Sequence, residues 1–110
     1  MNGIELEKSG DCTLIRLRGE VDMSWSQQVR QAVLKALDDS PRVGVVLSDV
    51  GYIDSSGVAA LVEGFQGSRS KGTVFALIAV SDAVRAVLEL ARLDRVFPIV
   101  ANVDSMPKAT

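Results

Sequence analysis

The chain alternates between two periodicities of apolar residues. Apolar side chains at every second position, or in short β-branched runs, are typical of strands, and they occur at residues 4–7, 13–18, 43–47, 73–80 and 95–100. Between these segments the apolar residues lie three or four positions apart, as in amphipathic helices. This spacing predicts helices from Ser24 to about Asp39, from about residue 56 to the glycines at 67 and 72, and from Ser81 to about Arg92.

The order of these segments predicts the fold class. The turn residues at 9–11 join the first two strands into an antiparallel hairpin, and strands then alternate with helices, as in parallel sheets built from right-handed crossovers. We therefore expect an α/β fold with a mostly parallel, mixed sheet of four to five strands, an N-terminal antiparallel hairpin and three to four helices. The last strand contains Pro98 and should be short or at an edge. The polar tail from Ala101 should be loose, and residues 1–110 should form one domain.

Composition narrows the function. The formal net charge is −2 with interspersed signs, which predicts no direct contact with nucleic acid and a protein or small-molecule partner instead. No apolar run approaches the ~20 residues of a membrane span, and the N-terminus lacks the pattern of a secretory signal. With the single Cys12 these features predict a cytoplasmic protein without direct membrane insertion. The chain has no histidine, so we expect no enzyme, no cofactor and no metal site.

Two polar clusters follow predicted strands, where sites form in folds of this class. One is residues 19–22 (GEVD), and the other is residues 54–57 (DSSG), directly before the second helix. If Ser55 is the N-cap, its hydroxyl lies beside free N–H groups at the positive end of the helix dipole, where a phosphate would be favourable. Asp54 would stiffen the turn or orient that hydroxyl. Helix capping alone also accounts for this pattern, so the spacing leaves both interpretations open.

The segment 52–58 (YIDSSGV) resembles the signature of STAS domains, specifically of anti-sigma factor antagonists of sporulation and stress control. Residues 14–22 (LIRLRGEVD) are similar to the second strand and loop of that family. Residues 83–88 (AVRAVL) and 96–99 (VFPI) are similar to its third helix and last strand. The resemblance covers about nine tenths of the chain and implies the STAS fold.

The resemblance also implies a switch. In that family the serine after the aspartate, here Ser55, is phosphorylated by a serine kinase that is also the anti-sigma factor, and a serine phosphatase reverses the modification. The unphosphorylated form binds the anti-sigma factor and frees a sigma factor. A homodimer is possible. The partner-binding residues carried over are Asp22, Asp54, Ser56 and Gly57, with Ala59, Ala60 and Glu63 on the expected outer face of the second helix.

The sequence is also compatible, to different degrees, with functions other than an anti-sigma factor antagonist. STAS relatives also serve as accessory subunits of lipid-transport ATP-driven (ABC) complexes or in stress-sensing assemblies, through constitutive docking. A phosphoaspartate receiver at Asp54 is disfavoured, because the chain begins with a hairpin and lacks a late lysine beside residues 97–98. A hydrolase with Ser55 as nucleophile lacks a general base nearby in sequence. Trp25 and Phe65 fall in apolar stripes, which favours a place in the core over a ligand platform.

Overall fold

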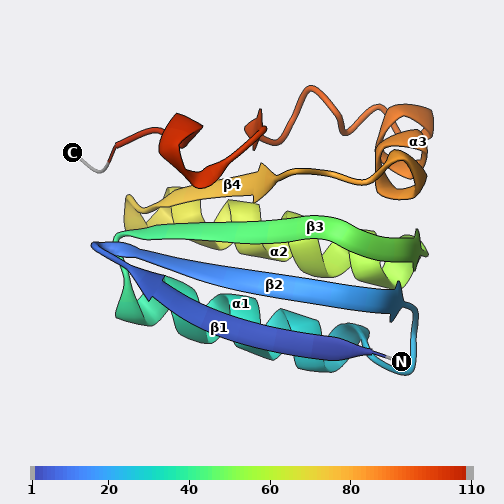
Figure 1. The fold of residues 1–110 in the computed structure, drawn as a ribbon, viewed down its shortest axis with the longest axis horizontal. Coiled ribbons are helices and arrows are strands. Elements are labelled where there is room, and N and C mark those ends of the chain that lie inside the picture. Colours follow the sequence, from blue (N-terminus) through green and yellow to red (C-terminus); the bar gives the residue numbers. More distant parts are fainter. Residues whose placement is uncertain (1, 109–110) are drawn as a thin grey trace.

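The structure is a computed structural model that describes residues 2–108. It confirms the predicted α/β architecture, a five-stranded mixed sheet with three α-helices (Figure 1). The elements in chain order are β1 Gly3–Ser9, β2 Cys12–Val21, α1 Ser26–Asp39, β3 Arg42–Ile53, α2 Ser55–Lys71, β4 Val74–Ile78, α3 Asp82–Leu90, β5 Ile99–Val100 and the short 3₁₀ helix η1 Val103–Ser105.

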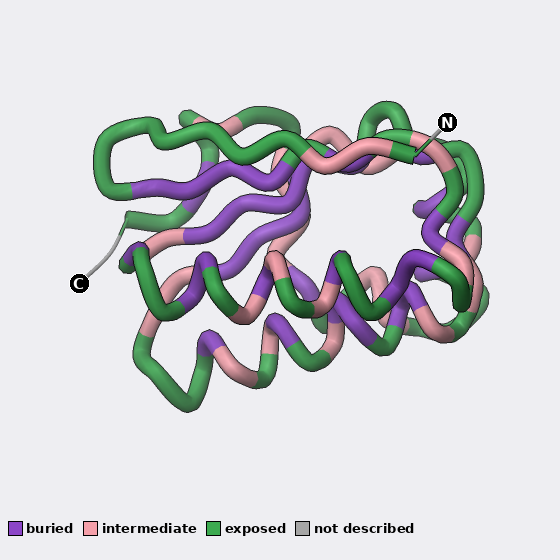
Figure 2. Tube along the Cα trace, turned by 90° about the horizontal axis from the view of Figure 1, so that it is seen from below, coloured by how far each residue is buried: buried purple, intermediate pink, exposed green. Residues whose placement is uncertain are grey.

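The strands lie side by side in the order in which they occur in the chain. β1 pairs with β2 antiparallel, as the hairpin predicted, and every later pair is parallel. Because each crossover has the same hand and steps in the same direction, the helices are placed on the same face of the sheet. Figure 2 shows α1 and α2 together below the strands. The strand order never reverses, so β2 and β3 end next to each other and present their following loops side by side.

The main core lies between the sheet and this layer of helices. From α1 it contains Val29, Val33 and Leu37, which are buried at the three-to-four spacing read from the sequence. Trp25 is only 7% exposed and belongs to this core, which confirms the prediction that it is a core residue. The three phenylalanines form a mutual cluster with ring centroids 5.7–6.4 Å apart. This packing fixes α2 against the sheet and therefore fixes the position of its N-terminus.

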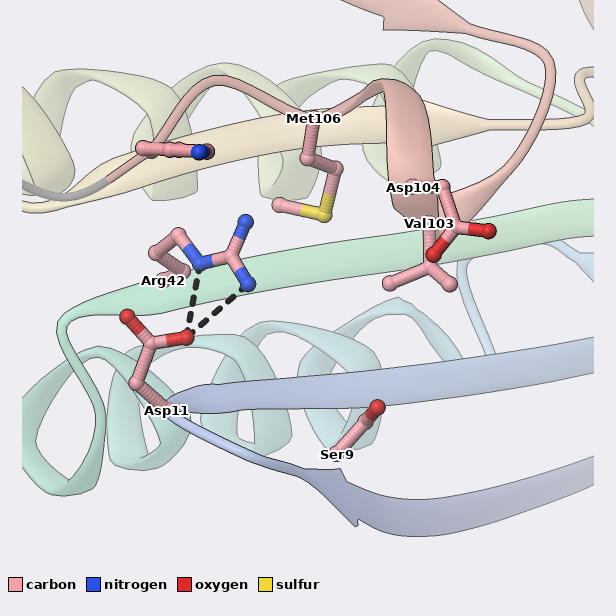
Figure 3. Close-up of a pocket in the computed structure, with 7 residues that line it drawn as sticks. Ser9, Asp11, Arg42, Val103, Asp104 and Met106 are labelled. Atoms are coloured by element: carbon pink, nitrogen blue, oxygen red, sulfur yellow. Dashed lines mark hydrogen bonds and ion pairs between the residues drawn. The ribbon is translucent and has the colours of Figure 1, made fainter.

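Part of the other face of the sheet is covered by the C-terminal segment 101–108, which we call the strap. Met106 is 4% exposed and packs on Leu14, Val46 and Ile78, with its sulfur 3.7 Å from the Cys12 thiol. Arg42 holds the strap by donating from Nη1 to the Pro107 carbonyl and binds Asp11 through Nε and Nη2 at 2.9 Å (Figure 3). The expectation of a loose tail from Ala101 was therefore wrong.

Some element boundaries differ from the prediction. β3 continues through the expected linker to Ile53, because residues 49–53 still pair with the end of β2 across two register shifts. α2 continues past Gly67 to Lys71, and Gly72 closes it as predicted, with a positive φ of 69° that provides a left-handed C-cap. β5 is short and at the edge of the sheet, as predicted, but it spans only two residues, because Val96 and Phe97 donate to the Leu93 carbonyl in a turn.

Candidate functional site

Two loops at the C-terminal edge of the sheet share one local structure. Residues 22–24 (Asp-Met-Ser) follow β2, and residues 54–56 (Asp-Ser-Ser) follow β3. In each loop the aspartate Oδ1 accepts from the backbone N–H of the serine two positions later, at 3.0 Å in the first and 2.9 Å in the second. In each it also accepts from that serine's hydroxyl at 2.6 Å. We call these the first and second Asp-X-Ser loops. Their middle residues, Met23 and Ser55, are both exposed.

The second loop begins α2, and its cap is Asp54 rather than Ser55. The Asp54 carboxylate accepts from the backbone N–H groups of Ser56 and Gly57, and its carbonyl accepts from Val58 N. Ser55 is the first helical residue. The expectation that a phosphate on Ser55 would meet free N–H groups was therefore wrong for residues 56 to 58. Asp54 already accepts hydrogen bonds from the N–H groups of all three residues.

The two serines of this loop differ in availability. The Ser56 hydroxyl is engaged by Asp54 and the residue is half-buried, whereas Ser55 is exposed and its hydroxyl has no hydrogen-bond partner within residues 2–108. A hydroxyl that accepts a phosphoryl group must be accessible to the kinase. Of the two, Ser55 is the exposed one, whereas Ser56 is half-buried with its proton directed at Asp54.

The electrostatics of the second loop centre on the Asp54 carboxylate. Its pKa lies below the ordinary value of 3.8, chiefly because the Ser56 hydroxyl donates to the ionised form. The backbone N–H groups of Gly57 and Ser56 act in the same direction, as does that of Met23 in the first loop, while partial desolvation opposes them. Asp54 is thus an ionised cap at neutral pH.

A close approach of backbones fixes the distance between the loops. Asp54 N donates to the Val21 carbonyl at 3.2 Å, at the end of β2. A Cβ at Gly57 would lie 2.7 Å from that same carbonyl oxygen and 2.7 Å from Ile53 Cγ1. Only glycine fits at this point of contact, so Gly57 has a structural role in seating α2 on the strand ends.

Beside the second loop, a groove of about 410 Å³ runs between the N-terminal halves of α1 and α2. Arg30 of α1 donates from Nε to Glu63 of α2 at 2.5 Å across this groove. Both side chains remain substantially exposed, so the ion pair is worth only about 0–1 kcal/mol and can be exchanged for contacts to another molecule. The groove is lined by Ser26, Gln27, Arg30, Ser56, Ala59, Ala60 and Glu63.

Comparison with known proteins identifies the family. The family model described as the STAS domain matches residues 3–106. The chain belongs to the STAS domain family. It is 29% identical over 101 residues to an anti-sigma F factor antagonist from Paenibacillus polymyxa, which covers 90% of this chain and 86% of the relative.

Solved structures agree with this assignment. An anti-sigma factor antagonist from Mycobacterium paratuberculosis superposes with a TM-score of 0.84 at 26% identity, covering 94% of this chain and 89% of the other. An anti-sigma-factor antagonist (STAS) domain protein from Planctomyces limnophilus gives 0.78 at 26% identity, covering 92% of each chain. The predicted STAS fold is therefore confirmed, and these three relatives are named as anti-sigma factor antagonists.

The STAS domain brings most of the predicted site residues together. Asp54, Ser55 and Gly57 lie at the start of α2, and Asp22 lies in the adjacent loop. Ser56, Ala59 and Glu63 line the groove. Ala60 also lines it but is 3% exposed and packs in the core, so the expectation that it lies on the outer face of α2 was wrong. Gly57 is buried as well and contacts Val21 instead of solvent.

The prediction from sequence missed the α1 side of the groove. Ser26, Gln27 and Arg30 lie there, and their positions i, i+1 and i+4 place them on one polar face of α1. That polar face was readable from the sequence, but its position against α2 was not.

Other chemistry finds little support in the described part of the chain. Residues 2–108 contain no group of three or more potential ligands among His, Cys, Asp and Glu that could hold a metal ion. Burial raises the pKa of the Cys12 thiol, so this cysteine is a weak nucleophile. Within the same residues, none of the helices has the length and apolar character needed to cross a membrane.

Proposed function

We propose that this STAS domain is an anti-sigma factor antagonist controlled by phosphorylation of Ser55. In its unphosphorylated form it binds an anti-sigma factor that is also a serine kinase, and this binding releases a sigma factor. Phosphorylation of Ser55 ends the binding, and a serine phosphatase restores it. The domain itself performs no catalysis.

The observation that carries this proposal is the contrast between the two adjacent serines. Ser55 offers an exposed hydroxyl without a hydrogen-bond partner in the described chain, on a backbone that Asp54 and α2 hold rigid. Ser56 has the same chemistry, but it is half-buried and its hydroxyl proton is directed at Asp54. A kinase approaching this helix end therefore meets Ser55 as the accessible hydroxyl.

The effect of the phosphate follows from its surroundings. A phosphoserine carries about −1.5 to −2 charges at neutral pH. At Ser55 this charge lies beside the ionised Asp54 carboxylate, which already binds the helix N–H groups at positions 56 and 57. The phosphate therefore projects from the surface, where it would face the phosphates of the nucleotide held by the kinase. Charge repulsion and bulk then oppose rebinding, while the fold of the domain is unaffected.

The neighbouring groove supports a protein partner. It adjoins Ser56 and is lined by small or polar side chains, among them Ala59, with the exchangeable pair of Arg30 and Glu63. Small residues allow a second backbone to approach closely. The groove thus extends the contact from the acceptor serine along α1 and α2.

The experiment begins with the natural modification state. Intact-mass spectrometry with fragment mapping, on protein recovered from its own cells with and without stress, should find a phosphate confined to Ser55. Immobilised Ser55→Ala protein should then capture the kinase, which is identified, expressed and purified. In titrations against this kinase, Ser55→Ala should bind like the unmodified protein, and Ser55→Asp should bind at least about tenfold more weakly.

Ser70→Asp is the matched control, because Ser70 is an exposed serine near the other end of the same helix. It should bind like the unmodified protein. Equal binding by Ser55→Ala and Ser55→Asp, or a protein that is never phosphorylated, would contradict the switch. That result would favour constitutive docking as an accessory subunit of a lipid-transport or stress-sensing complex.

A further inference from the structure

The first Asp-X-Ser loop presents a large apolar side chain to water. Met23 is 79% exposed, although Trp25, only two residues later, is buried in the core. Its backbone is held on both sides, because the Asp22 side chain binds Ser24 and the Asp22 carbonyl accepts from Trp25 N and Ser26 N at 3.0 and 2.8 Å. The thioether is therefore exposed on a preorganised turn rather than on a flexible one.

This turn is attached to the proposed phosphorylation site. Asp54 N donates to the Val21 carbonyl at 3.2 Å, two residues before Met23. Because the two loops share the same turn, Met23 and Ser55 are equivalent middle residues presented at one edge of the sheet. A molecule that reaches Ser55 across this edge therefore also meets Met23.

Isolated exposed apolar residues are common on proteins and need no explanation by themselves. Leu6 provides the comparison within this chain. It is 60% exposed, but it follows Ile4 on the core-facing side of β1 and lines a shallow crevice against α1. Like Leu6, Met23 belongs to neither of the two buried clusters, but it is not among the residues that line this crevice.

The charges around Met23 indicate the chemistry of its counterpart. Glu20 and Asp22 flank it in the chain, and neither forms an ion pair with any residue from 2 to 108. Unbranched methionine adapts to apolar pockets of varied shape. A complementary surface therefore has an apolar pocket for the thioether and lysine or arginine side chains at its rim.

We propose that Met23 is a specificity-determining anchor for the kinase partner, inserted into an apolar pocket with a basic rim. This inference rests on the proposed function and deepens it, since it assigns a binding role to a residue outside α2. Preorganisation of the turn limits the conformational entropy lost on binding, which is a property of residues that dominate interface energetics. Met23 determines which kinase the domain binds, and phosphorylation of Ser55 by that kinase ends the binding.

The test uses the purified kinase captured by Ser55→Ala and compares Met23→Ser, Met23→Leu and Leu6→Ser. Met23→Ser should weaken binding about tenfold or more, mainly through faster dissociation. In the phosphorylation reaction it should raise the KM for the domain with little change in kcat, because an anchor remote from the hydroxyl contributes uniform binding. Met23→Leu should restore most of the affinity, and Leu6→Ser should bind like the unmodified protein. Thermal unfolding of each variant verifies that it is folded.

The outcomes separate this inference from the proposed function. If Met23→Ser binds normally while Ser55→Asp binds weakly, the anchor is overturned and the switch stands. If Leu6→Ser weakens binding as much as Met23→Ser, the effect is not specific to the loop and the anchor is again overturned. If the unmodified domain and Ser55→Asp bind equally, the switch itself fails and the anchor falls with it.

Discussion

The two Asp-X-Ser loops have the same hydrogen bonds but lead into their helices differently. After the first, α1 begins only at Ser26, and its N-cap Trp25 forms no side-chain cap hydrogen bond. After the second, α2 begins at once, with Asp54 as a cap that reaches the N–H of the third residue, Gly57, at 3.2 Å. The same turn therefore presents an exposed side chain, Met23, in the first case and starts a helix in the second.

The residue three positions after the aspartate differs between the loops. In the first loop it is Trp25, whose large side chain enters the core, and α1 begins at the next residue. In the second it is Gly57, which lets α2 contact the end of β2 directly. A loop that only presents a side chain tolerates a bulky residue at this position, whereas a loop that also seats a helix does not.

The largest expected effect comes from substituting this glycine. Gly57→Ala would place a Cβ 2.7 Å from the Val21 carbonyl oxygen, a backbone atom that cannot easily move. We expect a loss of about 2 kcal/mol in the free energy of unfolding, with overpacking offset in part by the better helix propensity of alanine. Urea unfolding followed by circular dichroism measures this loss.

Gly67→Ala is the control on the same helix, because its Cβ would find its nearest neighbour at 3.4 Å. It should gain about 0.5–1 kcal/mol, as alanine does in a helix interior. Similar changes for the two variants would show that the close approach at Gly57 does not limit stability.

The next effect compares the two aspartates. Asp54→Ala removes the cap hydrogen bonds to residues 56 and 57, so its melting temperature should fall by several degrees. Asp22→Ala removes only the side-chain bonds to Ser24, since the Asp22 carbonyl still binds Trp25 and Ser26. Differential scanning calorimetry should therefore show the smaller fall for Asp22→Ala. The reverse order would mean that the first Asp-X-Ser loop, not the helix cap, holds this edge together.

A smaller effect concerns pH. The folded state lowers the pKa of Asp54, so the carboxylate stabilises the fold above its unfolded pKa, and this contribution is lost as the pH falls through the lower, folded value. Stability of the unmodified protein should thus decline on acidification below about pH 4. Asp54→Asn can still cap α2 but does not titrate, so its decline should be shallower in urea titrations across this range. Parallel declines would assign the acid sensitivity to other carboxylates.

The smallest effects are expected at the two middle residues. Ser55→Ala and Met23→Ser alter exposed side chains that make no contact on which the fold depends, so each should stay within about 0.5 kcal/mol of the unmodified protein in urea unfolding. Together with their predicted effects on binding, this would separate function from stability at both loops. A substantial loss for either variant would indicate a structural role instead.

The periodic parts of the fold were predictable from sequence, and the details of the site were not. Val29, Val33 and Leu37 are buried at helical spacing, so α1 could be read directly. Aspartate and serine both cap helices, however, and only the three-dimensional turn decides that Asp54 rather than Ser55 is the cap. Ala60 is compatible with either side of a helix, and its burial depends on where α1 packs.

The strap was missed for a different reason. Met106 and Val103 are isolated apolar residues in a mostly polar segment, and the contact of Met106 with Cys12 spans 94 positions in sequence. The space that it fills exists because residue 44 is glycine, where a Cβ would lie 3.0 Å from the Met106 sulfur. A single sequence carries no periodic signal for such a long-range fit.

The strap also has a consequence for synthesis on the ribosome. Since the strands are added to the sheet in chain order, the helix-covered core can assemble progressively as the chain emerges. The opposite face, with Leu14, Val46 and Ile78, gains its cover only after Met106 has left the exit tunnel. A nascent chain that stalls before this residue therefore leaves an apolar sheet surface uncovered, and such a surface is prone to aggregation.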